Sequence, residues 1–470
     1  FRETFADDYR LATLSLEEWD MTADDAVYTN MLAGDYALAT VTFGPMVVLD
    51  GTGFDNTLQH GNSYTREAAD GSWNADTGWF GSTNNIACRY PTSKAGTVND
   101  IPDVTLPAQA ITYTWAQGQL AGRFINDNTW WSYANYALTI GADDGVNKIV
   151  YETAAELPWS SSLSGDAHVA IPTLYNSGRV SSGAALRAYF NIRSIYTQNG
   201  VAPQTLEGWF QNYKMLGYGT GNSASNYGRF DGTGMDVSAT ASFKNLFNGD
   251  DYLRIVDIST WQMPEASSRE GMFAGCVNLG DPTVGSLTLG QGVVLEGSGI
   301  DGLSTRGITQ GRWLLMDGED ELWFDSSAEL ENRYGTIATV TARYVDNAIT
   351  TRPADTYTYV WDSSKLGGRF YSNQDAWWTF TPTSGNVATL TTKGTLAIGA
   401  DVAGAEVTED ATTASPYVLP WIAPLGGSNY LNRVTAVTTT GRLAPTTLHG
   451  WFQDMTSLVS FDGNGLNPTN

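Results

Sequence analysis

The sequence predicts a mainly β protein with short helices, in which solenoid segments of repeated strands alternate with small β modules. Three observations predict this fold class. The chain repeats itself at a fixed offset, and its apolar residues recur with the spacing of short inward-facing strands. Only 16% of its 470 residues are charged, whereas an average soluble domain has roughly 25%. A surface covered largely by Asn, Ser, Thr, Gly and Gln is typical of an extracellular β-rich protein.

The duplication is the clearest feature of the chain. The segment TLEGWFQNYKML begins at Thr205, and TLHGWFQDMTSL begins 242 residues later at Thr447. The same offset aligns FRETFADDYRLATLSLEEWDM, residues 1–21, without gaps to FKNLFNGDDYLRIVDISTWQM, residues 243–263. Because chance would not preserve apolar spacing over so many residues, we predict two copies of a unit of about 240 residues.

The register of the two ends predicts a longer array. The last residues, FDGNGLNPTN, match FDGTGMDVSATAS in the first copy, which is followed directly by the counterpart of Phe1. We therefore expect the 470 residues to be a window on a longer tandem array of the same unit.

Each copy contains an L-x-x-L-x-L pattern. In a leucine-rich repeat this spacing turns two alternating residues of a short strand inward, and the first leucine caps the preceding turn. Rungs of this kind cannot bury their apolar face alone and must stack on neighbours. The residues that form the pattern are Leu11, Leu14 and Leu16 in the first copy and Leu253, Val256 and Ile258 in the second.

These motifs carry a family resemblance. The order G-W-F, F-D-G-x-G, F-x5-L-x-x-L-x-L-x-x-W-x-M and M-[LF]-A-G resembles the BspA-like leucine-rich repeats of bacterial surface proteins. Their alternation with GRF, WW, LTIGAD and PW segments is similar to that in large cell-surface members of the family. The resemblance covers residues 1–55, 190–300 and 430–470, and Asp35 stands where the family's repeat usually has Cys. It implies degenerate leucine-rich-repeat solenoid segments and a secreted or cell-surface location.

The remaining half of each unit is rich in Trp and Gly, and ITYTW and TYTYVW alternate as short antiparallel strands do. The best candidates for short helices are residues 184–190 and 326–334. We predict leucine-rich-repeat segments at 1–55 and 186–300, irregular connectors at 56–104 and 301–354, β modules at 105–185 and 355–428, and the start of a further leucine-rich-repeat segment at 429–470.

Charge and hydropathy exclude two classes of partner. The net charge of −25 would repel nucleic-acid phosphates and anionic lipid headgroups, so no nucleic acid is expected as a partner. No run of about 18 apolar residues is present, so we expect no membrane span in this segment. Cys88 and Cys276 do not occupy matching places in the two copies, and we interpret both as buried thiols.

No catalytic, cofactor-binding or metal site is predicted. His60, His168 and His449 have no histidine at the matching place in the other copy, which argues against a triad or a zinc site. Carboxylates that do recur, Asp7-Asp8 with Asp250-Asp251 and Asp143 with Asp401, are expected to satisfy backbone donors at turns. The acidic segment at 317–322 lacks the spacing of a calcium loop and is expected to be a solvated loop.

The tryptophan pairs are the one recurrent feature with binding potential. Aromatic faces can stack on sugar rings or anchor a protein interface, although fixed places in a repeat are also what a small β core requires. The candidate ligand or interface contacts are Trp130, Trp131, Trp377 and Trp378.

The function expected from these observations is surface display and adhesion by a non-enzymatic extracellular repeat protein. Its partner would be a protein or glycan on another cell or matrix, or copies of itself, because repetition adds modest contacts through multivalency. One alternative is a structural subunit of a self-assembling extracellular filament. A second is a polysaccharide hydrolase, which would need a pair of carboxylates converging in a cleft.

Overall fold

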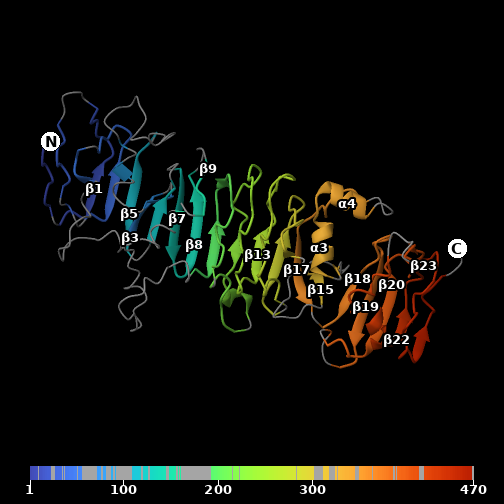
Figure 1. Ribbon diagram of the computed structural model, residues 1–470. Helices are drawn as coiled ribbons and strands as arrows, with labels where there is room; N and C mark the ends of the chain where they lie inside the picture. Colours follow the sequence, from blue (N-terminus) through green and yellow to red (C-terminus); the bar gives the residue numbers. More distant parts are fainter. Residues whose placement is uncertain are drawn as a thin grey trace. The chain divides into compact units, whose positions relative to one another are not determined.

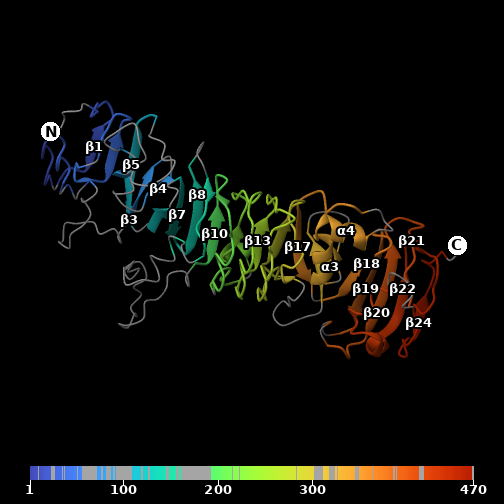
Figure 2. The ribbon, with the colours of Figure 1, turned by 45° about the horizontal axis from the view of Figure 1, so that its top comes forward.

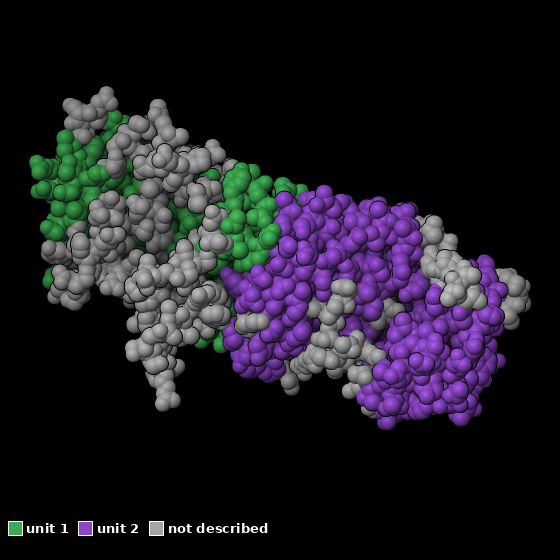
Figure 3. Space-filling model, in the orientation of Figure 1, with its two compact units in different colours: residues 1–209, 231–240 green, residues 210–230, 241–470 purple. Residues whose placement is uncertain are grey.

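The computed structural model divides the chain into two compact units, shown in different colours in Figure 3. Unit 1 comprises residues 1–209 and 231–240, and unit 2 comprises residues 210–230 and 241–470. The structure describes residues 1–8, 10–22, 27–33, 35, 38–49, 51–54, 71–75, 78–80, 86–87, 90, 108–117, 120–124, 128–143, 148–154, 157, 159, 192–213, 215–221, 223–281, 283–300, 311–316, 323–324, 326–344, 349–362, 364–384, 387, 389–411 and 418–467.

Unit 1 begins with a five-stranded sheet in the order β1-β2-β5-β3-β4 (Figure 1). Strands β1 and β2 are parallel, whereas the remaining pairs are antiparallel. The strands are β1 (Thr13–Leu16), β2 (Thr40–Phe43), β3 (Gly71–Ala75), β4 (Gly78–Phe80) and β5 (Ile111–Gln117).

The rest of unit 1 combines an antiparallel meander with a parallel strand. Strands β6, β7 and β8 pair antiparallel in chain order, and β10 then pairs parallel with β8, as β11 does with β9. These elements are β6 (Leu120–Arg123), β7 (Thr129–Ala134), β8 (Ala137–Ala142), β9 (Ile149–Val150), β10 (Ser194–Thr197) and β11 (Ala202–Pro203).

Unit 2 begins with the same pairing pattern as the first sheet of unit 1. Strands β13 and β14 are parallel, and β17, β15 and β16 follow antiparallel in that order. The elements are η4 (Ala224–Asn226), β13 (Ile255–Ile258), β14 (Ser286–Leu289), β15 (Arg312–Leu315), β16 (Trp323–Phe324), α3 (Ser327–Arg333), α4 (Ile337–Arg343) and β17 (Tyr357–Asp362). Strand β12 (Phe230–Asp231) falls on the boundary of the two units.

The second part of unit 2 is a five-stranded sheet in the order β18-β19-β20-β22-β24, whose strands lie side by side in Figure 2. Strands β18, β19 and β20 pair antiparallel, and β20, β22 and β24 pair parallel. Strands β21 and β23 form a separate, short parallel pair. The elements are β18 (Leu366–Arg369), β19 (Ala376–Pro382), β20 (Gly394–Ala400), β21 (Glu406–Val407), η7 (Ser428–Arg433), β22 (Val434–Thr439), β23 (Ala444–Pro445) and β24 (Ser460–Asp462).

The inward residues of the L-x-x-L-x-L pattern are confirmed. Leu14 and Leu16 of β1 are buried while Thr13 and Ser15 are exposed, and Val256 and Ile258 are buried in β13. Burial of alternate side chains is the property of a strand with one face on a core.

A second set of parallel backbone contacts accompanies the short strands. In unit 1 the N–H of Phe5 donates to the carbonyl oxygen of Met31 at 3.0 Å, and in unit 2 Phe247 donates to Met272 at 2.9 Å. The ring of Phe247 also stacks on the ring of Phe273, and the two centroids lie 5.5 Å apart. The turns before the paired strands are therefore joined by backbone hydrogen bonds as well.

The cores of the two first sheets contain matching aromatic contacts. The centroids of Trp73 and Trp115 lie 5.5 Å apart in unit 1, and those of Trp313 and Trp361 also lie 5.5 Å apart in unit 2. Buried tyrosine hydroxyls are likewise hydrogen-bonded at matching places, Tyr90 with Tyr113 at 3.2 Å and Tyr334 with Tyr359 at 3.0 Å.

The prediction of a mainly β fold is confirmed, and so is the helix at 326–334, which forms α3. Helix α4 was not predicted, and the helix expected at 184–190 lies outside the described residues. Cys276 is buried as expected, and its Sγ donates to the carbonyl oxygen of Phe247 at 3.1 Å, whereas Cys88 lies outside the described residues.

Candidate functional site

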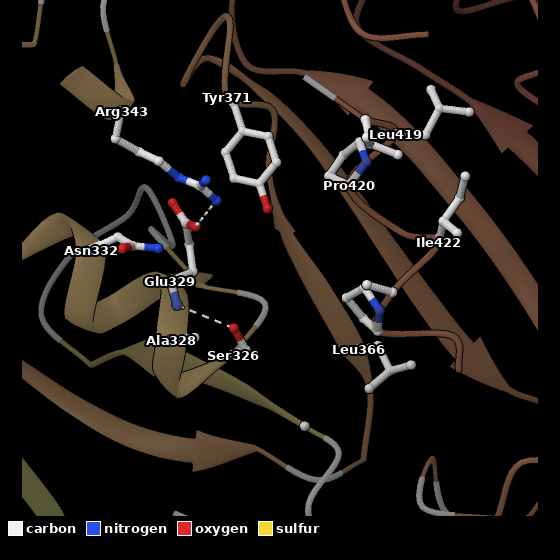
Figure 4. A pocket seen from close by; sticks show the side chains of 14 residues that line it. Ser326, Ala328, Glu329, Asn332, Arg343, Leu366, Tyr371, Leu419, Pro420 and Ile422 are labelled. Atoms are coloured by element: carbon white, nitrogen blue, oxygen red, sulfur yellow. Dashed lines mark hydrogen bonds and ion pairs between the residues drawn. The ribbon is translucent and has the colours of Figure 1, made fainter. Parts of the chain in front are cut away.

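A cavity of about 540 Å³ lies in unit 2, between the two helices and the segment that follows β21. Helices α3 and α4 supply its polar wall, and residues 418–424 with the start of β18 supply an apolar wall, as Figure 4 shows. The lining residues are Gly311, Ser326, Ala328, Glu329, Asn332, Arg343, Leu366, Tyr371, Val418, Leu419, Pro420, Ile422, Ala423 and Pro424.

Capping fixes the two helices that carry the polar wall. The Ser326 side chain accepts a hydrogen bond from the Glu329 N–H at 3.1 Å, and the Thr336 side chain accepts one from the Thr339 N–H at 3.3 Å. Ser326 and Glu329 have the spacing of a capping box. The Glu329 carboxylate, however, turns to helix α4.

Glu329 is the centre of the polar wall. Arg343 donates from Nη2 to its Oε2 at 3.1 Å, and the Tyr344 hydroxyl donates to its Oε1. The carboxylate is buried, and this burial raises its pKa, while the guanidinium of Arg343 opposes the shift. Burial and the neighbouring Glu329 charge raise the pKa of Tyr344 well above its ordinary value. The hydroxyl therefore stays protonated and holds the carboxylate in place.

Arg343 connects this ion pair to the mouth of the cavity. Its side chain is 37% exposed, and its guanidinium lies over the ring of Tyr371, 4.3 Å from the centroid. Figure 4 shows Arg343 and Tyr371 on one side, facing Leu419, Pro420 and Ile422. The Tyr371 ring packs against the Arg343 guanidinium and faces an apolar wall. This arrangement suits the binding of a ligand with an apolar or sugar face.

The described lining of the cavity contains a single carboxylate. Of the described residues that line it, Glu329 is the one carboxylate, and both of its oxygens accept hydrogen bonds from the protein. Glycoside hydrolysis needs two carboxyl groups on opposite sides of the scissile bond. The described part of the cavity does not offer the second group.

The tryptophans predicted from the sequence lie on β7 and β19 and not in this cavity. Trp130, Trp131 and Trp378 are buried, and Trp377 is partly buried. A Cβ on Gly141 would lie 2.4 Å from the Trp130 ring, so the indole lies across that glycine. These positions are those of core side chains, and contact with a ligand stays a prediction for them.

Two recurrent aspartates form ion pairs that the sequence interpretation missed. Arg123 donates from Nη1 to Asp143 Oδ2 at 2.7 Å, and Arg369 donates to Asp401. For both aspartates the sequence analysis expected hydrogen bonds from backbone N–H groups of turns. The signal was present in the sequence, because the Arg of each GRF and the Asp of each GAD recur together. Asp250 does accept a backbone N–H as expected, from Tyr213 at 2.7 Å.

The cavity residues were missed for a different reason. The sequence search required candidates to recur in both copies, whereas Asn85 and Ile125 stand in the first copy at the places of Glu329 and Tyr371. The chemistry of the cavity therefore belongs to the second copy alone. The Ser-x-x-Glu spacing of 326–329 was the available signal, and it indicates only a helix start.

The remaining candidates give no further site in the described structure. His449 is exposed, with its N–H donated to Thr447 Oγ1, while His60, His168 and the acidic segment 317–322 lie outside the described residues. Among the residues that are described, no group of His, Cys, Asp and Glu side chains could hold a metal ion, and no helix is long and apolar enough to cross a membrane.

Comparisons of this chain with protein-family models, with curated proteins and with solved structures found no match.

Proposed function

We propose that this chain is a non-enzymatic, secreted repeat protein that serves surface display and adhesion on a bacterial cell, as part of a longer tandem array of BspA-like leucine-rich repeats. The observation that carries the proposal is that short strands pair in parallel and that the turns before them are joined to one another by backbone hydrogen bonds. Stacked units of this kind extend a surface by repetition and present the same contacts many times.

Hydrogen bonds and ring stacking between successive turns support the proposed solenoid segments. Phe210 donates its N–H to Leu246 at 3.1 Å, and Phe247 donates to Met272 at 2.9 Å. The rings of Phe210 and Phe247 stack with centroids 6.0 Å apart, and Phe247 stacks in turn on Phe273. Each rung, meaning one short parallel strand with its turn, thus buries its aromatic residue against the next rung.

Matched contacts support two copies of one unit. Thr42 and Thr112 share a hydrogen bond between their Oγ1 atoms at 2.9 Å, and Thr288 and Thr358 share one at 3.2 Å. Both pairs are separated by 70 residues. The same contact at the same separation is the expected product of a duplication.

The cavity beside Arg343 and Tyr371 is the proposed contact for a glycan or protein ligand. To test adhesion, beads coated with the chain are offered to a glycan array and to immobilised extracellular-matrix proteins. We expect coated beads to bind about a hundredfold more strongly than the single chain, because many weak contacts act together. Beads that bind no more than uncoated beads would contradict the proposal.

A substitution taken from the first copy tests the cavity. Tyr371→Ile introduces the residue found at 125, and it should reduce bead binding while leaving the circular dichroism spectrum unchanged. Val402→Ser, at a 55% exposed residue outside the cavity, is the control and should bind as the natural chain does. If Tyr371→Ile binds as strongly as Val402→Ser, the ligand contact does not lie in this cavity.

The array itself is tested by the intact mass of the native polypeptide under denaturing, reducing conditions. We expect a mass well above that of the 470 residues, with peptides that resemble further copies of the unit. A mass equal to that of the 470 residues would contradict the array and leave adhesion by the shorter chain to be tested.

A further inference from the structure

The polar wall of the cavity in unit 2 contains an ion pair whose two charges neutralise each other. Arg343 donates from Nη2 to Glu329 Oε2 at 3.1 Å, and the Tyr344 hydroxyl donates to Glu329 Oε1. Both donors stabilise the ionised form of the carboxylate, which is buried. Glu329 and Arg343 are the charged residues among the described ones that line the cavity. The described lining therefore carries no net charge.

The other lining groups form an aromatic surface, an apolar wall and a polar edge. The Arg343 guanidinium lies over the Tyr371 ring, 4.3 Å from its centroid. Figure 4 shows this ring across the cavity from Pro420 and Ile422, while Asn332 lies on helix α3. The volume of about 540 Å³ is that of a site for a small ligand or for part of a larger one.

A sugar ring matches these surfaces. A pyranose has a face of C–H groups, which packs on an aromatic ring, and an edge of hydroxyls, which bonds to polar side chains. Tyr371 and the apolar wall suit the C–H face. The Asn332 amide suits the hydroxyls, because an amide side chain has both donors and an acceptor.

The ion pair determines which charge such a sugar can carry. A ligand carboxylate loses its water on entering a cavity, and only a cation that is not already neutralised offsets this cost. Glu329 neutralises Arg343, so a ligand carboxylate placed at Arg343 would lie close to a second carboxylate and be repelled. Repulsion of the wrong ligand is one of the two sources of specificity.

We propose that the cavity binds a neutral sugar ring of a glycan, and that Glu329 excludes acidic sugars because it neutralises Arg343. This inference rests on the proposed function and deepens it by naming the ligand class of the same cavity. A neutral glycan also suits a chain with a net charge of −25, which repels polyanions.

Matched sugars test the ligand class. Beads coated with the natural chain are offered at pH 8 to glucose, galactose and mannose oligomers and to uronic acid oligomers of the same linkage, which differ in a carboxylate at carbon 6. We expect binding to neutral oligomers that is lost in Tyr371→Ile. Binding to each uronic acid counterpart should be at least about tenfold weaker.

Salt separates the effect of the cavity from that of the net charge. In 1 M salt the Debye length is about 3 Å, so long-range repulsion between the chain and a polyanion is suppressed. The preference for neutral oligomers should persist there, because the buried ion pair is screened much less. A preference that disappears in 1 M salt would overturn the inference. This comparison uses the natural chain and does not depend on the folding of a variant.

Two variants test the role of Glu329. Glu329→Gln keeps the size of the side chain and leaves the Arg343 charge without its carboxylate, so binding of uronic acids should rise at least about tenfold relative to neutral oligomers. Glu329→Gln combined with Arg343→Gln removes both charges and should return this ratio to that of the natural chain. Val402→Ser, outside the cavity, is the control, and circular dichroism checks that each variant is folded.

The outcomes separate this inference from the proposed function. Beads that bind neither glycans nor matrix proteins would contradict adhesion and this inference together. Beads that bind uronic acids as strongly as neutral oligomers, or bind only a protein, would overturn the neutral sugar and leave adhesion intact. A folded Glu329→Gln chain with the same ratio as the natural chain would overturn the role of Glu329.

Discussion

Trp451 donates its indole N–H to the carbonyl oxygen of Glu409 at 2.9 Å, and both residues are buried. In the first copy Trp209 makes the same bond with Glu152 at 3.2 Å. The W of each G-W-F motif therefore holds the segment just after β9 or β21, which comes before LPW in the sequence, against the next rung. Its recurrence has a structural reason, because a buried carbonyl needs a donor.

Substitution of Trp451 tests this bond. Trp451→Phe keeps an aromatic ring but leaves the Glu409 carbonyl without its donor, and we expect a loss of about 1 to 3 kcal/mol of local stability. Trp421→Phe is the matched control, since Trp421 is equally buried, lies 5.5 Å from Trp451, and its Nε1 has no hydrogen-bond partner among the described residues. Hydrogen exchange of residues 394–439 measures the loss of local stability in each variant. Equal losses for the two variants would contradict a role for the bond.

Asp35 predicts a pH dependence of unit 1. Its side chain is 1% exposed and accepts the N–H of Asp8 at 3.0 Å. Burial raises its pKa from 3.8 to about 7, assisted by the charges of Asp8 and Asp7 and opposed by that hydrogen bond. Because the folded pKa lies above the unfolded one, the stabilising contribution is present below pH 4 and is lost as the pH rises to 7 and beyond, at most about 4 kcal/mol.

The second copy supplies the variant for this test. Cys276 stands at the place of Asp35, so Asp35→Cys should remove the pH dependence and stabilise unit 1 above neutral pH. The reciprocal Cys276→Asp should introduce the same dependence in unit 2, since Cys276 is fully buried. Hydrogen exchange of residues 1–54, compared between variant and natural chain at each pH, measures the effect. A constant difference between pH 4 and 8 would contradict it.

Gly141 is predicted to be required by the indole of Trp130. The two residues face each other on β8 and β7, and a Cβ would lie 2.4 Å from the ring, so Gly141→Ala should cost about 2 kcal/mol or more. Gly399→Ala, which faces the partly buried Trp377, should cost less because that ring can shift toward solvent. Melting temperatures of the two variants test this. A larger loss for Gly399→Ala would contradict the explanation.

Recurrence explains which parts of the fold could be predicted from sequence. Leu14, Leu16, Val256 and Ile258 repeat at a fixed offset with the spacing of a strand, and they are the inward residues of β1 and β13. Local signals were sufficient there because alternation along four residues fixes which side faces the core. The ion pair of Arg123 with Asp143 joins residues 20 apart in the chain, and its sequence signal is the joint recurrence of the Arg of GRF and the Asp of GAD and not a local pattern.

The mainly β class, the inward faces of the short strands and the helix at 326–334 could be predicted from sequence, because each depends on residues that are neighbours along the chain. The meeting of Glu329, Arg343 and Tyr371 at one cavity depends instead on how the helices pack against the sheet that follows them, which the local sequence does not show. Burial and proximity are set by elements distant in sequence, so identical motifs acquire different environments at different places in the fold.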